Sequence, residues 1–232
     1  MTTLVVLAGD THEDESFAGV LSSTESGHLR EAMLADVCEL VQHGEADLLV
    51  NYADGSKAQI KELLDSELNN PDAVRYEPQV GSSRSARIGN ALTHLIEQEG
   101  AATVGVVDPT AVFLRREHIG TLAMKLRMSD VVVGPAPDGR LTLVGMTKPF
   151  DFTDVYNPPA LETVTERATG EQLDVDFLAM TPLVDSVADL RTAIPLLNAR
   201  HRAGRAVPVR TTARIEQWGL AVSDGEVVRS EE

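Results

Sequence analysis

The sequence contains one cysteine, few aromatic residues and no long apolar run. The single Cys38 excludes an internal disulfide and a metal site built from several cysteines. It falls within a helical apolar pattern, so we expect a buried and unreactive thiol. No apolar run approaches the roughly 18 residues that span a membrane. The N-terminal residues MTTLVVLAGD lack the basic start and apolar stretch of a signal peptide, and we expect a cytoplasmic protein.

Basic residues are also scarce. The chain has 20 Lys and Arg against 36 Asp and Glu, which gives a formal net charge of -16, and lysine occurs only at positions 57, 61, 125 and 148. A chain this acidic has no broad basic face, so we expect neither nucleic acid nor a membrane as a partner. Many acids, few lysines and 4% aromatic residues are typical of a salt-adapted, halophilic protein. An ordinary acidic cytosolic protein is the alternative.

Apolar runs typical of buried strands alternate with helical patterns along most of the chain. Strands are expected at 3–7, 47–52, 74–78, 102–107 and 174–180. Helices are expected at 28–43, 56–68, 81–99, 115–126, 156–168 and 186–203, the last with a break or kink at Pro195. This alternation predicts a three-layer α/β/α domain with a mostly parallel sheet.

The C-terminal segment departs from this alternation. Residues 214–222 and 226–228 flank Asp224-Gly225, a tight-turn signal, and predict a terminal β-hairpin. We therefore assign residues 1–205 to the α/β domain and residues 206–232 to a hairpin appendage packed on the same domain. A homodimer contact through this hairpin is one possible use of it.

The most distinctive stretch is 129–146, SDVVVGPAPDGRLTLVGM. It predicts a strand, a Pro/Gly turn and a second strand. Its sequence resembles the "DVVLGPAxDGGYxLIG" signature of the DUF2064 family. Three further elements follow the family in the same order: QVG at 79–81 with Arg87 and Ala91, VGVVDP at 104–109, and VDSVADL at 184–190. The matches extend over about half of the chain.

Members of the DUF2064 family resemble nucleotide-diphospho-sugar transferases and have a glycosyltransferase-A-type fold. The resemblance implies a nucleotide or nucleotide-sugar bound at the carboxyl ends of the strands, where open α/β sheets generally bind ligands. It implies that Asp108 helps to hold a divalent ion, Mg²⁺ or Mn²⁺, and that Gly9 and Asp10 lie near the base or ribose. Carboxylate oxygen suits such a hard cation. The alternative is that Asp108, which precedes a proline, only forms a turn.

Phosphate contacts are expected where the third long helix begins. Gly81 and Ser82 precede this helix, and Arg84 and Arg87 lie in its first turns. A helix N-terminus offers free amide donors and a positive dipole end to an anion. An ordinary serine cap with solvated arginines is the alternative.

One further pair of residues belongs to the candidate site. Asp138 and Arg140 could place a carboxylate and a guanidinium at the mouth of the pocket, or they could simply form the hairpin turn. Asp185 and Asp189 are expected to open and cap the last long helix, although related folds place an acid near the metal at this point. The six histidines show no metal-ligand spacing, and we expect them at the surface.

The chain differs from the family after the first strand. The family carries a loop with Lys and Arg there, which neutralises phosphates, whereas this chain has no basic residue before Arg30. The function predicted is a nucleotide- or nucleotide-sugar-binding transferase that uses a divalent ion. A non-catalytic descendant that acts as a binding module is one alternative, and a guanylyltransferase for an archaeal cofactor is another. The residues do not identify a catalytic base.

Overall fold

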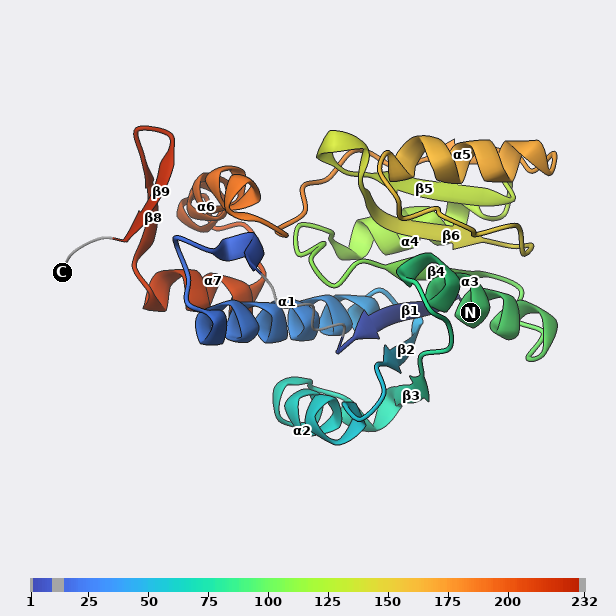
Figure 1. Ribbon diagram of the computed structural model, residues 1–232, viewed down its shortest axis with the longest axis horizontal. Coiled ribbons are helices and arrows are strands. Elements are labelled where there is room, and N and C mark those ends of the chain that lie inside the picture. Colours follow the sequence, from blue (N-terminus) through green and yellow to red (C-terminus); the bar gives the residue numbers. More distant parts are fainter. Residues whose placement is uncertain (1, 10–14, 230–232) are drawn as a thin grey trace.

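The computed structural model describes residues 2–9 and 15–229, and its centre is a seven-stranded sheet (Figure 1). The strand order is β3-β2-β1-β4-β6-β5-β7, and only β6 runs antiparallel to its neighbours. The strands are β1 Thr3–Ala8, β2 Asp47–Tyr52, β3 Val74–Pro78, β4 Val104–Val107, β5 Val131–Pro135, β6 Leu141–Met146 and β7 Val175–Phe177. The mostly parallel sheet predicted from the alternation of strands and helices is confirmed.

Helices cover both faces of this sheet. They are α1 Ser23–His43, α2 Lys57–Glu67, α3 Arg84–Glu97, α4 Arg116–Lys125, α5 Ala160–Gly170, α6 Val187–Arg202 and α7 Val209–Gln217, with 3-10 turns η1 Glu15–Phe17, η2 Pro71–Ala73 and η3 Pro137–Gly139. Side chains from α1, α2, α4, α6 and α7 share one hydrophobic core, and those from α3 and α5 share the other. The three-layer α/β/α architecture is confirmed.

Strand β1 shows how the sequence supplies both cores. Leu4 and Val6 point into the core on the α1 side, and Val5 and Leu7 point into the core on the α3 side. Successive side chains of a strand face opposite sides of the sheet, so a strand covered on both faces needs a continuous apolar run. This explains why TLVVLA is buried along its whole length.

The chain changes direction across the sheet between β1 and β4. From β1 it proceeds outward to β2 and β3, and then returns to place β4 on the other side of β1. The connections that leave the carboxyl ends of β1 and β4 therefore diverge. Ligands of open α/β sheets bind in the crevice that such a divergence opens.

The hairpin predicted within 129–146 is also confirmed. Strands β5 and β6 pair antiparallel, and η3 forms the turn between them. Asp138 and Gly139 both adopt positive φ values, 61° and 67°. Aspartate and glycine tolerate this left-handed conformation better than most residues, which is why the PDG sequence forms the turn.

The boundaries of three helices differ from those expected. Helix α1 begins at Ser23, five residues early, because Ser22 and Glu25 form a reciprocal capping box. Helix α5 begins only at Ala160, since two prolines precede it and the residue before a proline avoids helical geometry. Helix α6 continues through Pro195, so of the predicted break or kink the break is wrong.

The strand predicted at 214–222 is wrong in its first half. Residues up to Gln217 belong to helix α7, and only β8 Leu220–Ser223 and β9 Glu226–Arg229 form the hairpin. Ile215 and Thr211 are buried on one face of α7, which packs against α1. Tertiary packing of this face therefore decides a segment that reads locally as a strand.

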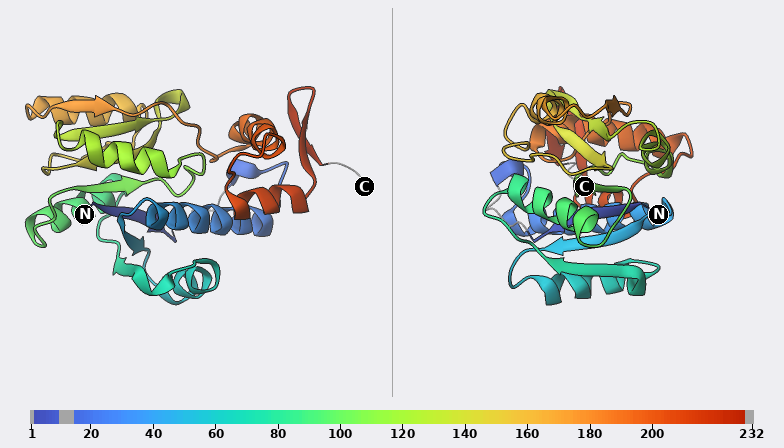
Figure 2. Two further views of the ribbon diagram at one scale, coloured as in Figure 1. Left: turned by 180° about the vertical axis from the view of Figure 1, so that it is seen from behind. Right: turned by 90° about the vertical axis from the view of Figure 1, so that its right-hand side faces the viewer.

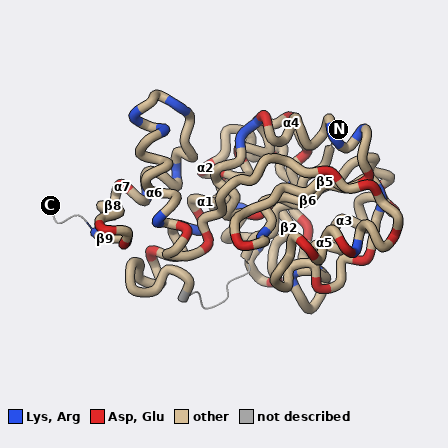
Figure 3. Tube along the Cα trace, turned by 90° about the horizontal axis from the view of Figure 1, so that it is seen from above, with Lys and Arg blue, Asp and Glu red and all other residues tan. Residues whose placement is uncertain are grey.

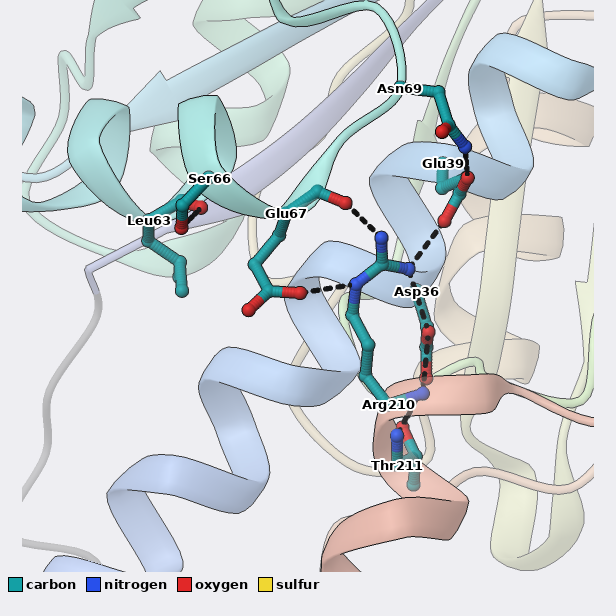
Figure 4. A network of polar contacts seen from close by, with 8 residues as sticks. All are labelled: Asp36, Glu39, Leu63, Ser66, Glu67, Asn69, Arg210 and Thr211. Carbon is teal, nitrogen blue, oxygen red and sulfur yellow. Dashed lines mark hydrogen bonds and ion pairs between the residues drawn. The ribbon is translucent and has the colours of Figure 1, made fainter.

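The C-terminal elements gather around α1, beyond the carboxyl ends of the strands (Figures 1 and 2). Hairpin β8–β9 contacts α6, and α7 contacts α1. Arg210 links α7 to α1 and α2, because its guanidinium pairs with Asp36 and Glu39 of α1 and with Glu67 of α2 (Figure 4). Burial disfavours the charge of Arg210, but these three carboxylates hold its pKa above the usual value.

Acidic residues are spread along most of the chain, and one group of basic residues lies where α6 ends (Figure 3). The last turn of α6 carries Arg200, His201 and Arg202. Among the described residues, no helix combines the length and the apolar character needed to cross a membrane.

Candidate functional site

A cavity of about 580 Å³ opens at the carboxyl ends of the strands, beside the point where the connections of β1 and β4 diverge. Residues that follow β1, β2 and β4 form part of its wall, and the first half of α1 forms another part. Its charged lining residues are Arg30, Glu31, Asp54, Arg84, Asp108 and Asp185. This is the place where the fold predicts a ligand.

Asp108 is the most firmly held of these charges. It follows β4 directly, and its side chain is only 11% exposed. Its Oδ1 accepts hydrogen bonds from the backbone N–H of Thr110 at 2.8 Å and from the Thr110 hydroxyl at 2.7 Å. Its Oδ2 accepts a hydrogen bond from Arg84 Nη2 at 2.6 Å. The Asx-type turn suggested for Asp108 is therefore present, and the same carboxylate also faces the cavity.

A second carboxylate, Asp185, reaches the same cavity from the start of the α6 segment. Arg30 Nη1 donates to its Oδ1 at 3.2 Å. Burial in the cavity wall and the negative charge of Asp108 raise the pKa of Asp185, while Arg30 opposes this shift. Two acids and two guanidiniums thus converge here from four separate segments of the chain.

Local sequence explains how two of the wall residues are positioned. Ser83 caps α3 by accepting the backbone N–H of Ala86 at 3.1 Å, which places Arg84 at the first helical position. Gly9 follows β1 with φ +81°, and an added Cβ would lie 2.6 Å from Ser56 Oγ. Only glycine fits this turn, because a side chain would be strained and would collide with the start of α2.

Other predicted site residues lie elsewhere. Gly81 and Ser82 form the exposed loop before α3 and do not line the 580 Å³ cavity. Arg87 Nε donates to the Gly81 carbonyl at 3.2 Å, and Arg87 lines a second cavity of about 320 Å³. Asp10 lies outside the described residues. Of the expected set, the structure brings Gly9, Arg84 and Asp108 together.

Asp138 and Arg140 do not line the larger cavity either. Arg140 forms a two-point ion pair with Asp189, with N–O distances of 2.9 and 2.6 Å. Burial alone would raise the pKa of Asp189, but the hydrogen bonds from Arg140, Asp185 and Ser186 hold it below its usual value. Ser186 is the cap of α6, and Asp189 completes this cap. The pair therefore joins the β5–β6 turn to the start of α6.

A second acidic group was not visible in the sequence. Ligand atoms of Glu77, His94 and Glu99 lie within 4.8 Å of one another beside the smaller cavity. Arg75 already pairs with both carboxylates, however, and binds both oxygens of Glu99 at 2.7 Å. Asp108 and Asp185 are also paired with arginines, and they line the larger cavity together with Arg30 and Arg84.

Comparisons with solved structures agree with this architecture. A protein from Desulfovibrio desulfuricans G20, named as a candidate nucleotide-diphospho-sugar transferase, superposes with a TM-score of 0.75 over 93% of this chain and 95% of its own, at 17% identity. The 4-diphosphocytidyl-2C-methyl-D-erythritol synthase of Anaerococcus prevotii DSM 20548 gives 0.53 over 85% and 98%, at 12% identity. At these identities the likeness shows the fold alone.

A third similar structure is a CMP:2-keto-3-deoxy-manno-octonic acid synthetase in complex with CTP, with a TM-score of 0.50 over 86% of this chain and 99% of its own, at 11% identity. No curated protein matches the sequence significantly. Residues 34–157, more than half of the chain, match the family described as "Uncharacterized protein conserved in bacteria (DUF2064)". The chain therefore belongs to the DUF2064 family.

Proposed function

We propose that this protein is a transferase that binds a nucleotide or nucleotide-sugar in the 580 Å³ cavity with the help of a divalent ion, Mg²⁺ or Mn²⁺. One observation carries the proposal: the carboxylates of Asp108 and Asp185 and the guanidiniums of Arg30 and Arg84 converge in a single cavity at the carboxyl ends of the strands. A nucleotide phosphate with its cation needs both kinds of charge side by side.

Asp108 and Asp185 would hold the cation. Mg²⁺ typically takes one or two carboxylates and completes its shell with water and phosphate oxygens. Both acids offer hard oxygen donors. Burial and then the charge of Asp108 raise the pKa of Asp185, and a positive ion at these carboxylates would favour its charged form. When bound, the ion would neutralise charge on the departing phosphate.

Arg30 and Arg84 would bind the phosphates. The chain has no Lys or Arg between Ala8 and Leu29, so the loop after β1 cannot neutralise a polyphosphate. The structure supplies two guanidiniums to the same cavity from α1 and α3. Arginine binds phosphate through two parallel hydrogen bonds. These two residues support phosphate binding despite the missing basic loop.

The remaining parts of the proposal rest on the fold. Gly9 lines the cavity after β1 and would lie beside the base or ribose together with Asp10. Gly81, Ser82 and Arg87 would contribute only if the ligand extends past the start of α3. The similar structure named as a 4-diphosphocytidyl-2C-methyl-D-erythritol synthase and the one in complex with CTP support a nucleotide as the ligand.

A non-catalytic binding module is the second candidate function. It is favoured by the ion pairs that already neutralise both carboxylates within the cavity. A guanylyltransferase remains a subset of the transferase proposal, because the donor base is not identified. A protein that serves only to bind other proteins would not bind nucleotides. A transferase would bind a nucleotide and convert it, whereas a binding module would bind it without turnover.

Thermal unfolding against a panel of nucleotides and nucleotide-sugars tests the proposal. The panel is measured with and without Mg²⁺ or Mn²⁺, at low salt and in molar KCl. A ligand at 100 times its Kd stabilises by about 2.7 kcal/mol, which is about 5–10 °C in Tm for a chain of this size. Asp108→Asn should abolish the part that depends on metal, and Asp151→Asn, at an exposed ion pair, is the control. Absence of any shift across the panel would refute the proposal.

A further inference from the structure

We propose that the smaller cavity, of about 320 Å³, is a second binding site, which holds a small heteroaromatic ring that bears an amino group. The cavity lies between the end of β3 and helix α3, and it shares no described lining residue with the larger cavity. Its volume is at the lower end of the roughly 300–1,000 Å³ usual for small-molecule sites. A small ring compound suits this volume.

Asn51 is the residue of this wall that points to a ligand. It is a polar residue within the buried part of β2 and is only 2% exposed. Its Nδ2 donates to the carbonyls of Glu77 at 3.3 Å and of Pro78 at 3.2 Å. Because a carbonyl can only accept, these bonds fix which way the carboxamide points. Within the described part of the chain, its Oδ1 accepts no hydrogen bond. Buried acceptors are normally satisfied, so this oxygen in a cavity wall indicates a donor on a ligand.

Glu77 supplies a second acceptor beside Asn51. The two residues are register partners on the adjacent parallel strands β2 and β3, which run about 4.8 Å apart. They lie on the face that α3 covers, since Leu49, two residues before Asn51, packs into the core on that side. Arg75 pairs with Oε1 of Glu77, but a carboxylate offers about four lone-pair sites. Two neighbouring acceptors therefore suit a ligand with neighbouring N–H donors.

The rest of the wall indicates a neutral, flat ligand. Pro78, Val80 and Ala91 give it apolar surface, and Val80 is 63% exposed. An aromatic ring would remove such surface from water. Arg87 also lines the cavity, and its charge disfavours a cationic amine there. An amino group on a heteroaromatic ring donates N–H without a positive charge.

Such a ring comes either from a free compound or from the base of a nucleotide whose phosphates lie in the larger cavity. In the second case the inference rests on the proposed function. Gln79 Nε2 links the two walls, since it donates to the carbonyls of Ala8, in the larger cavity, and of Asn51, in the smaller one. The free compound is the expected source, because the described walls have no residue in common.

The test measures binding of adenine and 2-aminopyrimidine to the full chain by titration calorimetry, with purine and pyrimidine as matched compounds without the amino group. The amino compounds should bind about tenfold more tightly, since one hydrogen bond distinguishes them. Asn51→Leu should remove this preference. Ala91→Leu should fill the cavity and abolish binding of both amino compounds. The matched control is Ala199→Leu, at an exposed position of α6 outside both cavities.

Equal binding of the compounds with and without the amino group, or binding that Ala91→Leu leaves unchanged, would overturn the site. Ala91→Leu decides the question if Asn51→Leu does not fold. If Ala91→Leu abolishes ring binding but leaves the nucleotide-induced rise in Tm unchanged, a free compound is the source; if both are lost, the base of a nucleotide is. A nucleotide-induced rise in Tm that depends on Asp108, without any ring binding, would leave the proposed function standing and refute only this site.

Discussion

Asp36→Ala should weaken the attachment of helix α7 to α1. The Asp36 carboxylate is 6% exposed and accepts the backbone N–H groups of Arg210 at 3.1 Å and of Thr211 at 2.8 Å, as well as the Thr211 hydroxyl at 2.8 Å (Figure 4). Pro208, at the cap position of α7, has no side chain that could do this. A residue of one helix therefore caps the N-terminus of another.

The cost follows from the groups left without partners. Loss of a cap acceptor costs about 1 kcal/mol. The Thr211 hydroxyl is fully buried, and a buried donor without a partner costs about 1–3 kcal/mol. Arg210 keeps Glu39 and Glu67, so its charge is not left unpaired. We expect a loss of about 3 kcal/mol, or about 6–12 °C in Tm. Asp36→Asn should lose about half as much, because its carboxamide oxygen still accepts hydrogen bonds.

Urea unfolding at 25 °C, with calorimetry for Tm, measures these losses. Asp65→Ala is the control: Asp65 forms an exposed i,i+4 ion pair with Lys61, and such a pair contributes about 0.3–0.5 kcal/mol. The capping role of Asp36 fails if Asp36→Ala loses no more stability than Asp65→Ala. It also fails if Asp36→Asn and Asp36→Ala lose the same amount, because the acceptor oxygen would then be irrelevant.

Three further predictions concern a pH window, a thiol and a turn. Hydrogen bonds from Arg229 and Ser22 lower the pKa of Glu25 from 4.5 to about 2, so the stability that Glu25 contributes is complete above pH 4.5 and is lost as the pH falls toward 2. In Glu25→Gln, the free energy of unfolding should therefore depend less on pH between 4.5 and 2, and an unchanged pH dependence in this range would contradict the prediction. Burial raises the pKa of Cys38, which is 0% exposed, so thiol reagents should label it only after unfolding, and labelling of the native protein would refute its placement. Gly9→Ala should cost about 2 kcal/mol through its left-handed φ and the contact with Ser56, and should reduce ligand-induced stabilisation; a neutral result in urea unfolding would exclude this turn geometry.

Patterns of period two and 3.6 predicted most of the architecture. The run TLVVLA, the β5–β6 hairpin and the helices of the α/β domain all depend on neighbours within a few residues of the chain. The same holds for Asp108, whose position directly after a buried strand placed it at the carboxyl edge of the sheet. The element that failed, at 214–217, is helical because of contacts with α1, far away in the sequence.

Local sequence patterns could not predict which side chains share the larger cavity. Arg84 and Arg87 lie one turn apart, yet Arg84 reaches Asp108 while Arg87 turns back to the Gly81 loop and faces the smaller cavity. Asp185 was predicted chiefly as a helix opener, and its position beside Asp108 depends on how the α6 segment crosses the end of the sheet. Side-chain direction and chain crossing are not properties of local sequence.

The sequence by itself therefore determined the layers, the parallel sheet, the family and the edge at which a ligand should bind, because periodicity and turn chemistry are local. Only the tertiary structure decided which charges share the cavity. It showed that Arg30 and Arg84 bring to this cavity the positive charge that the loop after β1 lacks. Electrostatic interactions act through space over a few ångströms, and the fold alone sets which side chains come that close.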